Sequence, residues 1–185
     1  MIDVNELRRG VTFTLDGDLF RVLEYHHHKP GRGKATIRVQ VRNLRTGATR
    51  EMTFNSGDRV EDIRLEARMV EYLYSDGEFL HFMDISTFEQ PQLRTEIFGD
   101  DVLYLKEGLQ LKLSFYEGEV IDYELPTTVD QEVVEADVVV AGDTATGVTK
   151  SVTTETGLKV TVPQFVETGD VIRVDTRTGE YVTRI

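Results

Sequence analysis

The sequence predicts an all-β protein that consists of three small β-barrels. Hydrophobic and polar residues alternate with a period of two over many short segments, and turns containing Gly separate these segments. Two segments suited to hinges, Arg59–Glu66 and Leu125–Thr128, divide the 185 residues into thirds. We therefore expect domains at residues 1–64, 65–127 and 128–185.

The first domain has the clearest strand pattern. In Ala35–Asn43, hydrophobic residues at every second position point to one face and polar residues to the other. Val11–Leu15 and Leu19–Tyr25 flank a turn at Asp16–Asp18, where Gly supplies a positive φ, as expected for a β-hairpin. Thr49–Phe54 adds a further strand to a short, helix-poor set, which is typical of an SH3-like barrel.

The second and third domains fit OB-folds, which are partly open barrels of five strands. In the second domain, Arg68–Tyr74 and Phe79–Asp84 form an expected hairpin, leucines alternate from 109 to 113, and Arg94–Leu105 is the best candidate for a short helix. The strands expected in the third domain are Glu132–Val140, Lys159–Val162, Val171–Asp175 and Tyr181–Ile185.

Charge is distributed unevenly along the chain. The net charge of −12, taken alone, argues against a nucleic-acid-binding protein. However, residues 1–64 hold 12 Lys and Arg against 9 Asp and Glu, whereas the counts are 4 against 14 in residues 65–127 and 5 against 10 in residues 128–185. The segment from Arg21 to Arg42 contains six Lys and Arg residues and a single acid, Glu24. Such a local basic patch is the electrostatic footprint of phosphate binding, although a solvated charged strand face would have the same composition.

The strongest functional candidate is an exposed basic loop between two strand segments. Pro30 fixes φ on the approach, and glycines on both sides of Arg32 are free of steric restriction. The six residues from His26 to Arg32 could lift the guanidinium up to roughly 20 Å from the barrel, and its planar fork suits phosphate oxygens. An ordinary polar turn is the alternative. The residues that support the tip are Lys29, Pro30, Gly31, Gly33 and Lys34.

Motifs for nucleotide, metal and catalytic sites are incomplete. Gly33-Lys34 is followed by Ala35, and His28 stands where the first Gly of a P-loop belongs. On a strand only His26 and His28 share a face, and zinc needs three or four protein ligands. No nucleophile, base and orienting group assemble, so we expect no metal, no cofactor and no enzyme activity.

Composition also bears on the compartment. The chain has no Cys, which excludes disulfides, thiolate metal sites and cysteine nucleophiles. The acidic start, Met1–Glu6, does not suit a signal peptide, and no apolar run approaches the ~20 residues that span a bilayer. We expect a cytoplasmic monomer without a membrane partner.

Two segments of the third domain are weaker candidates. Gly142, Asp143 and Thr144 form a compact loop after a strand, while Tyr181 and Arg184 lie in the last strand. Tyr can stack on bases and Arg can bind phosphates, as in other small barrels. From the pattern alone, a turn and a last strand are the simpler interpretation.

Three stretches, in matching order and spread over essentially the whole chain, resemble bacterial elongation factor P. They are Lys29–Gly33 with the strand after it and Asn43–Gly47, then Tyr72–Phe79 through Phe88–Gln90, and finally Val171–Tyr181.

This resemblance implies both a fold and a function. Members of the family are L-shaped, with a KOW-like, SH3-like domain followed by two OB-folds. They bind both ribosomal subunits between the peptidyl-tRNA and exit-tRNA sites, and they relieve stalling at consecutive prolines. The position at the tip matches Arg32, which is then expected at the acceptor end of peptidyl-tRNA. The match also places Gly142, Asp143 and Thr144 beside exit-site mRNA, and Tyr181 and Arg184 against tRNA or the small subunit.

The sequence departs from the family at the tip. Many members carry a Lys there that is extended by a β-lysyl-type group, which Arg32 rules out. Some members with Arg carry rhamnose, so an Arg-modifying glycosyltransferase and an unmodified guanidinium both stay open. Lys150-Ser151-Val152 replaces a common Lys-Pro-Ala, and the single Pro126 replaces Pro-Pro. A generic RNA-binding β-barrel protein without a ribosomal role is the alternative function, and a scaffold whose acidic middle barrel binds a basic partner is a third.

Overall fold

The structure, a computed structural model, describes residues 1–138 and 149–185. It confirms the all-β class, because the described residues form one six-stranded and two five-stranded sheets with little helix. The chain divides into two compact units, residues 1–68 with 113–122 and residues 69–112 with 123–185.

The first sheet has the strand order β1-β6-β2-β3-β4-β5. Its apolar core consists of side chains from all of its longer strands, including Phe13, Phe20, Ile37 and Val39. A short 3₁₀ helix, Val4–Glu6, follows β1 and is capped by the Asp3 side chain. The strands are β1 (Ile2–Asp3), β2 (Thr12–Leu15), β3 (Asp18–His28), β4 (Thr36–Asn43), β5 (Thr49–Asn55) and β6 (Arg59–Asp62).

Two features of this sheet differ from the sequence prediction. Arg59–Asp62, expected within a hinge, forms strand β6 and pairs with β1 and β2. Only Val60 of this strand is buried, so its apolar pattern was too short to identify it. Strand β3 also continues past Tyr25 to His28, because its ladder with β4 extends to the pair His28 and Thr36.

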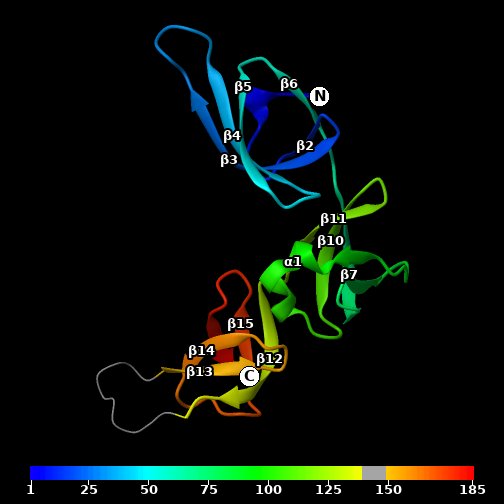
Figure 1. The fold of residues 1–185 in the computed structure, drawn as a ribbon, viewed down its shortest axis with the longest axis vertical. Coiled ribbons are helices and arrows are strands. Elements are labelled where there is room, and N and C mark those ends of the chain that lie inside the picture. Colours follow the sequence, from blue (N-terminus) through cyan, green and yellow to red (C-terminus); the bar gives the residue numbers. More distant parts are fainter. Residues whose placement is uncertain (139–148) are drawn as a thin grey trace. The chain divides into compact units, whose positions relative to one another are not determined.

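The β3–β4 hairpin is long because one of its faces is part of the core. Ile37 and Val39 are fully buried, and they pair across the ladder with His27 and Tyr25. The intervening side chain of Arg38 is exposed on the other face. The hairpin therefore combines a buried base with a polar outer face, and its loop projects beyond the rest of the sheet (Figure 1).

Residues 113–122 also belong to the first unit, where Ile121 packs with Leu19 and Leu44. Beside this cluster, the Arg21 guanidinium donates a hydrogen bond to the Asp122 carboxylate. Together, the apolar cluster and the partly buried ion pair attach strand β11 (Glu119–Glu124) to the β3–β4 sheet.

The second sheet has the order β11-β10-β7-β8-β9. The expected short helix is confirmed as one turn of α-helix, α1 (Thr95–Phe98), followed by a 3₁₀ helix (Gly99–Tyr104). Phe98 stacks on Tyr123 with ring centroids 3.7 Å apart, which holds α1 against the sheet. The strands are β7 (Glu66–Ser75), β8 (Phe79–Asp84), β9 (Gln92–Arg94), β10 (Gln110–Tyr116) and β11 (Glu119–Glu124).

The third sheet has the order β14-β13-β12-β15-β16 and surrounds a Val-rich core. Gln131 is fully buried there, and its side chain donates to the Leu103 carbonyl at 3.0 Å while accepting from the Thr154 hydroxyl at 2.5 Å. This network ties the 3₁₀ helix to the third sheet. The strands are β12 (Thr128–Ala136), β13 (Thr149–Thr154), β14 (Lys159–Pro163), β15 (Val171–Asp175) and β16 (Tyr181–Arg184).

Within residues 1–138 and 149–185, no helix has the length and apolar character needed to cross a membrane.

Candidate functional site

The basic loop predicted from the sequence lies at the end of the β3–β4 hairpin. The ladder closes at His28 and Thr36, and residues 29–35 connect the two strands. Gly33 has a φ of +117°, a conformation that L side chains rarely adopt, so Gly is required at this position. Arg32 is exposed beside it, next to the half-buried Pro30. The local sequence therefore builds a projecting turn that carries a guanidinium.

Two side chains on the outer face of the hairpin lie close to carboxylates. The His26 ring approaches the Glu24 carboxylate at 3.5 Å, and Arg38 approaches Glu51 at 3.3 Å. Both pairs are more than half exposed and are therefore worth little in stability. The pair of Arg38 with Glu51 nevertheless reduces the positive charge of the strand face.

Positive charge is uncompensated at the tip of the hairpin. Across residues 1–138 and 149–185, no hydrogen bond, ion pair or ring contact involves the side chains of Lys29, Arg32 or Lys34. An anion could approach these three cations without first breaking an internal contact. The tip therefore carries free positive charge, which suits binding to a phosphate-rich crevice.

The histidines beside the loop do not build a metal site in the described part of the chain. His26 and His28 pair with Arg38 and Thr36, while His27 pairs with the buried Ile37. In residues 1–138 and 149–185, no cluster of three or more His, Cys, Asp or Glu side chains could hold a metal ion.

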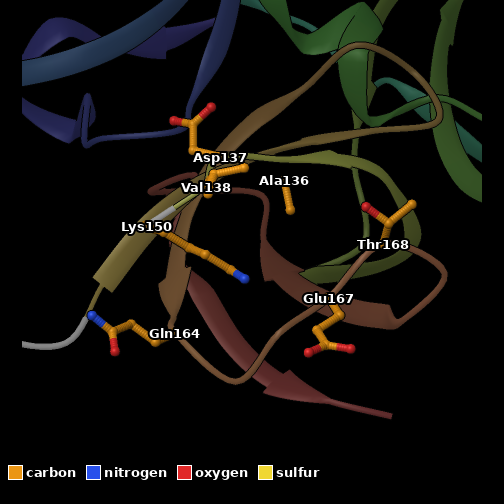
Figure 2. A pocket seen from close by; sticks show the side chains of 7 residues that line it. All are labelled: Ala136, Asp137, Val138, Lys150, Gln164, Glu167 and Thr168. Carbon is orange, nitrogen blue, oxygen red and sulfur yellow. The ribbon is translucent and has the colours of Figure 1, made fainter. Parts of the chain in front are cut away.

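Of the candidates predicted in residues 128–185, Gly142, Asp143 and Thr144 lie outside the described residues. An open cleft of about 480 Å³ lies where the described chain leaves β12 and enters β13. Figure 2 shows the Lys150 side chain extending across this cleft, toward the side on which Glu167 lies. Its remaining lining residues are Ala136, Asp137, Val138, Gln164 and Thr168.

Tyr181 and Arg184 lie on the last strand, β16. Tyr181 packs against the core of the third sheet and is half-buried. The Arg184 guanidinium lies 5.0 Å above the ring of Phe165 and 3.4 Å from the Asp170 carboxylate. Backbone donation from Glu167 and, to a lesser extent, Arg184 hold the pKa of Asp170 below its usual value. Sequence reasoning missed Phe165, an exposed ring that the pattern of strands gave no reason to select.

Three sequence families match successive parts of the chain. The elongation factor P (EF-P) KOW-like domain matches residues 3–60, the EF-P OB domain matches residues 65–123, and the EF-P C-terminal domain matches residues 129–184. The chain is also 48% identical to an elongation factor P of Moorella thermoacetica over 184 residues, a match that covers 100% of both chains.

A solved structure of a related fold is the eukaryotic translation initiation factor 5A from Methanococcus jannaschii. Its TM-score is 0.57 and its sequence identity is 21%, and the match covers 67% of this chain and 91% of that chain. At this identity the likeness concerns the fold alone.

Proposed function

The chain belongs to the elongation factor P family and is a translation elongation factor, and from this premise we propose that it binds the ribosome beside peptidyl-tRNA and relieves stalling at consecutive prolines. The observation that carries the proposal is the tip of the β3–β4 hairpin, where Lys29, Arg32 and Lys34 have no partner among the described residues. A projecting hairpin with free cations suits an acceptor end that is surrounded by phosphates.

The proposed mechanism is positioning. Arg32 approaches the acceptor end of peptidyl-tRNA and limits the disorder of a poorly oriented peptidyl-prolyl group, while the ribosome supplies the chemistry. Restricting a reactant to a productive geometry lowers the entropic part of the barrier. The chain is then not an enzyme itself. It should accelerate synthesis only where consecutive prolines leave the peptidyl group poorly oriented.

The remaining assignments follow the same family. We assign three domains, residues 1–64, 65–127 and 128–185, and the boundaries of the three family matches support this division. Gly142, Asp143 and Thr144 face exit-site mRNA in this proposal, while Tyr181 and Arg184 contact tRNA or the small subunit. The protein then acts in the cytoplasm, where ribosomes translate, and Arg32 is either unmodified or extended by a glycosyltransferase.

Replacement of Arg32 by Ala tests the proposal in a purified translation system. The variant should slow synthesis through consecutive prolines and leave a proline-poor message unaffected. Arg9→Ala is a matched control, because Arg9 is an exposed Arg of the same unit that lies outside the hairpin. Equal synthesis of both messages with wild type and Arg32→Ala would refute the role of the tip.

A generic RNA-binding role is the second candidate, since three free cations suit any phosphate backbone. Affinity for free tRNA would then fall with salt in proportion to the phosphates that the protein neutralises. Binding to ribosomes that hold peptidyl-tRNA, with little affinity for free tRNA, excludes this candidate.

A further inference from the structure

Strands β7 and β8 carry an exposed aromatic and apolar face. This face has no part in the role proposed for the tip of the β3–β4 hairpin. Leu80 and Phe82 of β8 are fully buried, so the alternate residues of this strand face outward. Cross-strand pairing sets His81 opposite Tyr74, with the rings stacked at 4.4 Å. Tyr74 is 55% exposed, which is unusual for a ring that is already held in place by a neighbour.

The stacked pair is rigid because a turn supports it. The His81 ring bonds the Asp76 carboxylate at 2.8 Å, and the other oxygen of Asp76 accepts the backbone N–H groups of Glu78 and Phe79. His81 and these backbone donors hold the pKa of Asp76 below its usual value. The Tyr74 ring is therefore presented in a fixed orientation rather than folded over the surface.

The loop after β8 presents a second ring at the cost of backbone strain. Phe88 has a φ of +61° and is 68% exposed, although bulky residues avoid this conformation. The buried Asp84 carboxylate accepts the N–H groups of Ser86 and Thr87, and the Asp84 carbonyl accepts that of Phe88 at 2.9 Å. Gly would relieve the strain, so the cost of Phe88 indicates that an exposed ring is useful here.

Two further exposed apolar residues lie at the end of the β7–β8 ladder that is opposite to Tyr74 and His81. The Ile85 N–H donates to the Met69 carbonyl at 3.3 Å, which sets these two residues side by side, and both are more than one third exposed. We use the term outer aromatic face for Met69, Tyr74, His81, Ile85 and Phe88. Exposed apolar surface of this kind marks interaction sites.

Charge selects the type of partner. Apart from the buried Asp84, residues 69–94 contain four acids and one Arg, and the guanidinium of that Arg94 lies 5.9 Å from the Phe79 ring. Affinity for nucleic acid comes mainly from Lys and Arg side chains that neutralise phosphates, and residues 69–94 contain too few of them. We propose that the outer aromatic face docks a Lys- and Arg-rich segment of a ribosomal protein, an inference that rests on the proposed ribosomal function.

The test uses purified ribosomes and two kinds of variant. Phe88→Gly removes the ring and relieves the strained φ, so it should weaken ribosome binding about tenfold while leaving the thermal stability equal or higher. Val134→Ser is a matched control, because Val134 is 51% exposed on β12, away from this face. Glu71→Lys, opposite Met83 on β7, should also weaken binding, whereas an RNA partner would bind this variant more tightly.

A photo-crosslinking residue at position 88 identifies the partner directly. Phe88→p-benzoylphenylalanine should crosslink to a basic segment of a ribosomal protein, above the level seen for the same residue at Val134. Crosslinks to ribosomal RNA alone, crosslinks no stronger than at Val134, or unchanged binding of Phe88→Gly would overturn this inference and leave the proposed function intact. Failure of the wild type to sediment with ribosomes would overturn both.

Discussion

Inserting two residues into each strand of the β3–β4 hairpin, after His28 and before Thr36, would move the tip outward without removing any charge. A strand rises about 3.4 Å per residue, so Arg32 would move by about 7 Å, and the even number of residues preserves which face each side chain occupies. A hydrogen bond needs its heavy atoms within about 3.2 Å, so the shifted guanidinium would miss its target. Ile37 and Val39 stay in place, so the core is unchanged.

The lengthened hairpin should therefore be as defective as Arg32→Ala. A single Arg contact to nucleic acid is worth about 1–3 kcal/mol, which corresponds to a loss of roughly 5- to 150-fold in the rate of synthesis through consecutive prolines. The assay compares reporter synthesis with and without a proline run, for wild type, Arg32→Ala and the insertion. If the insertion variant works as well as the wild type, charge alone is sufficient and the positioning mechanism is wrong.

Two further predictions concern stability. Gln131→Met keeps the side-chain volume but removes the hydrogen bonds to the Leu103 carbonyl and the Thr154 hydroxyl, so the free energy of unfolding in urea should fall by about 2–4 kcal/mol. The control Gln40→Met, at an exposed position, should lower it by less than about 0.5 kcal/mol. Equal losses for the two variants would contradict the role of the network. The Arg177 side chain, with its backbone N–H, lowers the pKa of Asp175 to about 2, from the ordinary 3.8. A lowered pKa gives stability that is present above pH 4 and lost as the pH falls toward 2, so Asp175→Asn should unfold more easily at pH 7 and depend less on pH below 4; identical acid-unfolding curves would contradict this.

Strands with a strict apolar alternation were predictable from the sequence, and others were not. Phe79–Asp84 was predicted with its observed bounds because every second residue is buried. Gln92–Arg94 buries only Leu93, and Thr149–Thr154 is mostly Thr, Ser and Lys, so neither has a pattern that distinguishes a strand from a loop. Arg59–Asp62 was mistaken for part of a hinge because its charged residues conceal one buried Val. These strands form because neighbouring strands offer a partner, which is information that local sequence lacks.

The candidate site was predictable in location but not in its balance of charges. A Pro and two glycines around Arg32 indicated a projecting loop, and the structure has that loop at the end of a long hairpin. The contacts of Glu24 with His26 and of Glu51 with Arg38 depend on side-chain geometry, and the second also on cross-strand register. The unfavourable φ of Phe88 could not be predicted either, because the amino-acid sequence does not reveal a strained backbone conformation.

The most direct test of the central claim is the single-turnover rate of peptide-bond formation between peptidyl-prolyl-tRNA and prolyl-tRNA on purified ribosomes. The wild-type chain should accelerate this reaction mainly through the activation entropy, Arg32→Ala should lose most of the acceleration, and a reaction without proline should be insensitive to both. Equal acceleration by wild type and Arg32→Ala, or acceleration that does not depend on proline, would contradict a tip that acts by positioning peptidyl-tRNA.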